Sequence, residues 1–144
     1  MSRIVPLPTT NTVVDNTVAI INADGSVASF AQVPSTANRI PSSANTTNAT
    51  SAKATAGALF SVNGYNSTAT VTYLKFYNKA TAPTVGTDTP VLTLALPASA
   101  AFSYNLGGIA FATGIGYGLT TVAADNGTTA PAAGAILGLN VVFS

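Results

Sequence analysis

The stretch from Ala69 to Leu96 constrains the fold most, because it reads as a strand, a turn and a second strand. Apolar and polar residues alternate along its first part, and this two-residue period is typical of a strand with one buried face. Leu74 and Phe76 are predicted to point inward. After a breaker run that contains two prolines and a glycine, the chain restarts as VLTLAL, in which the leucines share one face. The stretch therefore predicts two strands at the centre of a sheet.

Two groups of residues are predicted to lie on outer sheet faces. Tyr73 and Tyr77 flank Lys75 on the outward side of the first strand, and aromatic residues there commonly cover a neighbouring strand or a subunit interface. Gly116 and Gly118 share one face of a later strand, and glycines on a strand allow another backbone to pack closely. We take these five residues as interface candidates and favour contact with protein over contact with glycan.

Shorter segments are predicted to form further strands. ALFSV is followed by Asn63-Gly64, a standard two-residue turn sequence, which either closes a hairpin with residues 69–77 or begins a longer loop. ASAAFSYNLGG offers a strand and then a turn at Gly107-Gly108. The closing strand aligns four apolar residues on one face: Leu137, Leu139, Val141 and Phe143.

These segments give about six to eight strands at the spacing that is typical of antiparallel β-sheet proteins, and no segment has a helical period. The predicted fold is all-β, an antiparallel β-sandwich or a jelly-roll-like barrel over residues 38–144. Residues 1–37 are predicted to be an extended N-terminal arm, because prolines oppose a helix there. Within the arm, Asp24-Gly25 predicts the turn of a β-hairpin over residues 17–31.

Composition limits the classes of partner. Only 6% of the 144 residues are charged and the net charge is +1, so the chain has no electrostatic footprint for nucleic acid. Such weak charge also favours assembly over a monomeric state. Polar residues interrupt every apolar run well before the roughly 20 residues that span a bilayer, and no signal peptide is evident. We expect no membrane partner.

Catalytic and metal sites are not expected. The chain has no histidine or cysteine, and its aspartates stand beside turn residues or a proline, where they favour turns. A serine nucleophile would lack its usual base, and Lys53 beside Ser51 lies in a polar segment. The GIGYG sequence lacks the helix that follows a phosphate-binding loop. We predict a non-enzymatic protein with no catalytic residue, cofactor, metal or small-molecule substrate.

Several motifs resemble a known family. They are the strand end from Lys75 to Ala80, the turn from Ala82 to Pro90, the strand from Gly108 to Gly114 and the loop at Ala124-Asp125. From about Arg39 to the C-terminus, the chain resembles small Ala/Thr/Gly-rich β-domain structural proteins of tailed bacteriophage and prophage virions. Residues 1–37 fall outside the resemblance.

The resemblance implies a capsid decoration (cement) protein on the virion surface, made in the host bacterial cytoplasm. Its expected partners are the major capsid protein and other copies of itself, as a homo-oligomer for which a trimer is the suggested form. It would stabilise the head by binding across capsomers, with the arm lying along neighbouring subunits. The alternative is a tail, fibre or head-fibre component whose tyrosines contact host-surface glycan.

Overall fold

The computed structural model describes residues 20–21, 27–28 and 35–144 of the chain. The chain divides into two compact units, residues 1–33 and 34–144. In the first unit β1 (Ile20–Ile21) pairs antiparallel with β2 (Val27–Ala28), within the range predicted for the hairpin. The predicted turn at Asp24-Gly25 and most of the arm lie outside the described residues.

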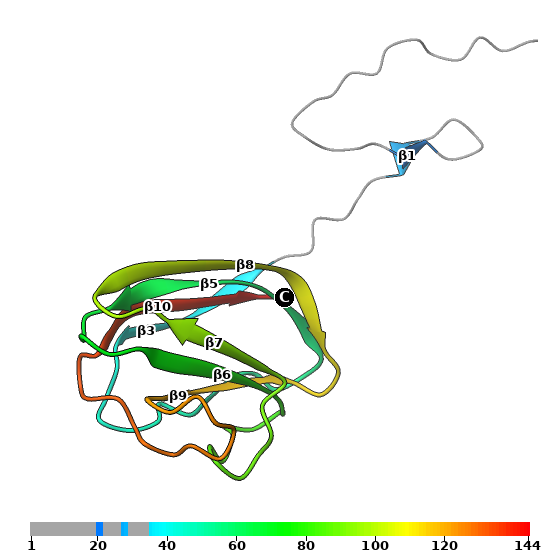
Figure 1. Ribbon diagram of the computed structural model, residues 1–144. Helices are drawn as coiled ribbons and strands as arrows, with labels where there is room; N and C mark the ends of the chain where they lie inside the picture. Colours follow the sequence, from blue (N-terminus) through cyan, green and yellow to red (C-terminus); the bar gives the residue numbers. More distant parts are fainter. Residues whose placement is uncertain (1–19, 22–26, 29–34) are drawn as a thin grey trace, which may run out of the picture. The chain divides into compact units, whose positions relative to one another are not determined.

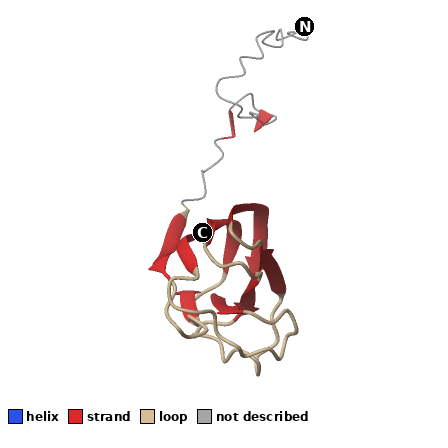
Figure 2. Ribbon diagram, turned by 60° about the vertical axis from the view of Figure 1, so that its left-hand side comes forward, coloured by secondary structure: helices blue, strands red, loops and turns tan. Residues whose placement is uncertain are grey.

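The second unit is built from strands and loops, and no helix occurs among its described residues (Figure 2). Its strands are β3 (Thr36–Ser42), β4 (Thr50–Lys53), β5 (Gly57–Asn66), β6 (Thr72–Asn78), β7 (Leu92–Leu96), β8 (Ala100–Phe111), β9 (Ile115–Thr120) and β10 (Ile136–Phe143). The predicted all-β class is confirmed. The first strand begins shortly before the predicted start of this unit.

The strands pair as a nested ribbon. The central hairpin joins β6 to β7, and outside it β5 pairs with β8, β4 with β9, and β3 with β10, all antiparallel. Additional pairing of β10 with β5 and of β9 with β6 joins these strand pairs into two separate sheets. Sheet 1 has the order β3-β10-β5-β8 and sheet 2 the order β4-β9-β6-β7 (Figure 1). This is the eight-stranded, two-sheet arrangement of a jelly roll.

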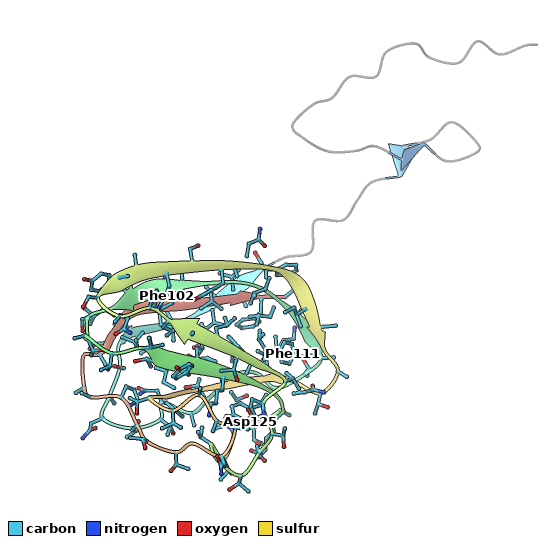
Figure 3. The ribbon with its side chains drawn as sticks, viewed as in Figure 1. Phe102, Phe111 and Asp125 are labelled. Atoms are coloured by element: carbon cyan, nitrogen blue, oxygen red, sulfur yellow. The ribbon has the colours of Figure 1, made fainter. Side chains whose placement is uncertain are left out.

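The core lies between the two sheets. Leu74 and Phe76 of β6 are completely buried, as predicted, and the Phe76 ring packs at centroid distances of 6.5 Å from Phe111 and 6.0 Å from Tyr117. Figure 3 shows Phe102 and Phe111 in the space between the sheets. Aromatic pairs at such distances add to the stabilisation that comes from apolar burial. The predicted central hairpin therefore supplies the middle of the core.

Two tyrosines connect the sheets at opposite edges. The Tyr117 hydroxyl of β9 donates a hydrogen bond to Asn38 Oδ1 of β3 at 2.6 Å. The Tyr104 hydroxyl of β8 donates to the Ala95 carbonyl of β7. Because the second bond occupies a carbonyl of a strand at the edge of sheet 2, it leaves that edge with one acceptor fewer for pairing with another chain.

The turns predicted at Asn63-Gly64 and at Gly107-Gly108 are wrong. Asn63 and Gly64 lie inside β5, where both pair with β8. Gly64 is needed for packing, because a Cβ there would lie 2.7 Å from the Phe102 ring and 3.2 Å from the Leu137 carbonyl oxygen. Gly107 and Gly108 lie inside β8 and have positive φ angles of 65° and 92°. They form a bulge at the register shift opposite β5, not a chain reversal.

The closing strand also departs from simple alternation. Leu139, Val141 and Phe143 share one buried face, but Leu137, which was predicted to lie on the same face, is 38% exposed. The register against β5 shifts between Leu137 and Asn140, and Gly138 between them has a φ of 58°. This bulge moves Leu137 to the outer face of the sheet, because an extra residue reverses the alternation of side chains.

Gly64→Ala tests the close packing of β5. The added methyl group has backbone atoms of β10 on one side and the Phe102 ring on the other, so relief requires a shift of the sheet. We expect the free energy of unfolding to fall by about 1–3 kcal/mol. Ser103→Ala, on the exposed side of β8, is the control and should change it by less than about 0.5 kcal/mol. Equal stabilities of the two variants in urea denaturation would contradict this account of Gly64.

Candidate interaction surface

The five predicted interface residues come together on the outer face of sheet 2. Lys75 is the cross-strand partner of Gly118, and Tyr77 is the partner of Gly116. Tyr73 lies at the other end of β6, between Thr120 of β9 and Ala95 of β7. The sequence pattern thus identified one continuous surface of the sheet. It did not show what covers that surface.

A first loop, residues 79–90, covers the glycines. A Cβ on Gly116 would lie 3.1 Å from Pro83 Cδ, and a Cβ on Gly118 would lie 2.6 Å from Val85 Cγ2. The expectation that something packs closely on these glycines is therefore confirmed. The group that does so belongs to the same chain, so Gly116 and Gly118 are buried within this unit.

Asp88 holds the 79–90 loop in shape. Its Oδ2 accepts a hydrogen bond from Lys79 Nζ at 2.6 Å and another from the Thr84 backbone N–H at 2.6 Å. These bonds, the one from Lys79 foremost, hold the pKa of the Asp88 carboxyl below its usual value of 3.8. The predicted role of this aspartate as a turn former agrees with these contacts.

A second loop, residues 121–129, covers Lys75. The carbonyl oxygen of Ala124 accepts a hydrogen bond from Lys75 Nζ at 2.5 Å and one from the Gly127 N–H at 2.8 Å. This loop also contacts the first one, since a Cβ on Gly86 would lie 2.3 Å from Thr128 Cγ2. Figure 3, in which Asp125 is labelled, shows the second loop on the side of sheet 2 that faces away from sheet 1. Together the loops form a two-loop cover.

The prediction that Lys75 and Tyr77 are exposed is wrong. Their exposed fractions are 0% and 1%. Burial lowers the pKa of the Lys75 ammonium below its usual 10.5, and the Asp125 carboxylate partly offsets this effect. Burial also raises the pKa of the Tyr77 phenol, and the carboxylates of Asp88 and Asp125 raise it further. These two side chains support the cover and are not available to a partner.

Tyr73 keeps part of its surface exposed and stays an interface candidate. The Tyr77 hydroxyl has no hydrogen-bond partner among the described residues.

The outer face of sheet 1, which we call the open face, is not covered by any segment of residues 35–144. Its residues pair across the strands on the side opposite the core and are all exposed or half-buried. They are Ala37, Arg39, Pro41, Ser61, Asn63, Tyr65, Ala101, Ser103, Asn105, Leu137, Asn140 and Val142. Only Arg39 among them is charged. The face is therefore broad, β-structured and almost uncharged.

The most apolar part of the open face is a cross-strand pair. Tyr65 of β5 is 42% exposed and lies opposite Leu137 of β10, with Ala101 on its other side. Asn140 Nδ2 donates a hydrogen bond to Asn63 Oδ1 at 2.9 Å nearby and orders the middle of the face. This pair was not predicted, because Leu137 was placed on the same face as Leu139 and the chain after Asn63-Gly64 was predicted to form either a hairpin or a longer loop. The available signal was the two-residue period that places Ser61, Asn63 and Tyr65 on the same side of an extended segment.

The described residues contain no group of three or more metal-ligating side chains. They also contain no helix long and apolar enough to cross a membrane. Comparisons with protein families, with curated proteins and with solved structures found no match to this chain.

Lys75→Met tests the cost of the buried amine. Methionine keeps an unbranched chain of similar length and removes the charge, so we expect equal stability or a gain of up to about 2 kcal/mol at neutral pH. Between the lowered pKa of Lys75 and 10.5, the unfolded wild type binds more protons than the folded one. As pH rises through this window, the free energy of unfolding of the wild type should therefore increase relative to that of the variant.

Chemical denaturation of both proteins from neutral to alkaline pH measures this difference. Lys53→Met, at a half-buried lysine of β4, is the control for loss of a lysine elsewhere. A large loss of stability in Lys75→Met at neutral pH, or a difference that does not change with pH, would show that burial of the amine is not costly.

Proposed function

We propose that this chain is a non-enzymatic structural protein of a bacteriophage virion, a capsid decoration protein that stabilises the head by binding across capsomers. The proposal names the major capsid protein and other copies of this chain as partners. Its mechanism is binding energy alone. The observation that carries it is the combination of a jelly-roll strand order with one broad, almost uncharged sheet face.

The strand order supports the proposal by analogy. Eight-stranded jelly rolls are the architecture of many viral capsid domains and of lectin domains. A fold alone does not define a function, so this support is added to the family resemblance of residues 39–144 and does not replace it. Both considerations favour a virion protein.

The open face supports binding to a protein surface. Interface cores are depleted of charged residues and enriched in tyrosine, and this face has Tyr65 beside Leu137 near one end and a single arginine at its edge strand. The two inner strands of this face, β10 and β5, are paired on both sides, so side-chain packing would provide the affinity there. A rigid face of this kind loses little conformational entropy on binding.

The alternative function is a tail, fibre or head-fibre component that contacts host-surface glycan. Burial of Tyr77 removes half of the tyrosine pair on which that hypothesis depended. Tyr65 favours it in another place, because an exposed aromatic ring can stack on a sugar and jelly rolls include lectins. The two functions differ in how many copies a particle holds.

The copy number of this chain in purified particles, measured by quantitative mass spectrometry against the major capsid protein, separates the two functions. A decoration protein should be present at a ratio near one, or at another fixed fraction of the whole lattice. A few copies to a few dozen copies per particle would support a tail or fibre position and would refute decoration of the shell.

Leu137→Asp tests the open face directly. A carboxylate in the middle of an interface must be desolvated without a partner, so we expect binding to heads lacking this protein to weaken by at least about tenfold. Val91→Asp is the matched control, because Val91 is a more exposed apolar residue and lies outside sheet 1. Co-sedimentation measures both, after thermal unfolding shows that each is folded. Equal binding of the two variants would exclude the open face.

A further inference from the structure

The sequence contains two Asn-Gly pairs, Asn63-Gly64 and Asn126-Gly127, and the fold gives them opposite surroundings. Asn126 is exposed in the 121–129 loop. Asn63 lies in the middle of β5, which is paired on both sides. Asparagine followed by glycine is the sequence most prone to deamidation, because glycine has no Cβ to hinder attack on the side-chain amide.

We propose that Asn126 is a site of spontaneous deamidation that changes the two-loop cover, and that Asn63 is protected from the same reaction. The inference concerns the covalent chemistry of the loop and is independent of the proposed virion function. Water is the only co-reactant, so the reaction requires no enzyme and no cofactor.

The reaction proceeds in two steps. The backbone nitrogen of Gly127 loses its proton and forms a bond to Cγ of Asn126, while the bond from Cγ to Nδ2 breaks and ammonia leaves. The resulting five-membered succinimide is then opened by water at one of its two carbonyl carbons. Opening gives either an aspartate or an isoaspartate, in which the main chain passes through the former side chain. No electrons are gained or lost.

The strand geometry protects Asn63. Ring closure brings the glycine nitrogen onto Cγ of the preceding residue, and the extended backbone of a strand keeps these atoms apart. The Asn63 side chain also accepts a hydrogen bond from Asn140 at 2.9 Å. Asn63 can react only when β5 leaves the sheet, which costs nearly the full free energy of unfolding.

The turn at Asn126 lies in a loop outside the strands and is restrained less, although Gly127 is buried and a Cβ there would lie 2.6 Å from Val122 Cβ. The bond that closes this turn is donated by the Gly127 N–H to the Ala124 carbonyl, which also accepts from Lys75. The Thr121 N–H closes the surrounding loop by donating to the Thr129 carbonyl. The reacting nitrogen is therefore partly engaged, and the turn has to open before the ring can form. Because Lys75 fixes the acceptor of that bond, Lys75 is a positioning residue that slows the reaction.

Deamidation would alter the cover in two ways. A new carboxylate would stand beside Asp125 above Lys75, and the formal net charge of the chain would fall from +1 to zero. Isoaspartate would also lengthen the backbone of the turn by one atom and displace the Ala124 carbonyl from Lys75. After deamidation, the 121–129 loop should therefore pack less closely on sheet 2.

The test is peptide mapping by mass spectrometry after incubation of the full chain at mildly alkaline pH and physiological temperature. We expect aspartate and isoaspartate at position 126 to accumulate at least about tenfold faster than at position 63 while the protein is folded. In denaturant the two sites should react at similar rates. Asn126→Gln is the control and should remove the main product. Lys75→Met should speed reaction at Asn126, because it releases the turn.

The outcomes decide each part of the proposal. Equal rates at positions 63 and 126 in the folded protein, or no reaction at 126 over a time in which the denatured chain reacts, would overturn it. An unchanged rate in Lys75→Met, with its fold verified by thermal unfolding, would refute the role given to Lys75. A faster rate in that variant at Asn126 and not at Asn63 would support it.

Discussion

The antiparallel pairing of β6 with β9 is the interaction on which the rest of this structure depends. On its inner side it places Phe76 opposite Tyr117 and Leu74 opposite Leu119, and these residues form the middle of the core. On its outer side it places long side chains of β6 opposite glycines of β9. The same register therefore fixes both the core and the shallow outer surface that the two loops fill.

Filling that surface determines which face of the protein is free. The glycines leave space that Pro83 and Val85 occupy. The loops also enclose Lys75, which lies beside these glycines. Enclosing an ammonium with one carbonyl acceptor costs desolvation free energy that apolar packing of the loops must offset. Once sheet 2 is covered in this way, sheet 1 has the only extensive uncovered sheet face in the described part of the chain.

Features that depend on local alternation of apolar and polar residues were predicted correctly from the sequence. Features that depend on contacts between distant segments were not. The β6 and β7 pairing and the burial of Leu74 and Phe76 follow from a two-residue period, and both are correct. The exposure expected for Lys75 was wrong, because the loop that covers it follows almost 50 residues later and carries no periodic signal. Asn63-Gly64 was misread because a glycine that permits a turn equally permits close packing inside a strand. The strand β4 was not predicted, because Ala52 is its only apolar residue and one residue gives no period.

An almost uncharged binding face has a kinetic consequence for the proposed function. Electrostatic steering accelerates association only where complementary charge is concentrated, and the open face offers one arginine, Arg39, on its edge strand. Association through it should then be slow per encounter and nearly independent of salt, with affinity set by shape and by apolar contact at Tyr65 and Leu137. Such binding suits a protein that attaches once to a repeating, preformed surface, where many neighbouring sites compensate for slow capture at each.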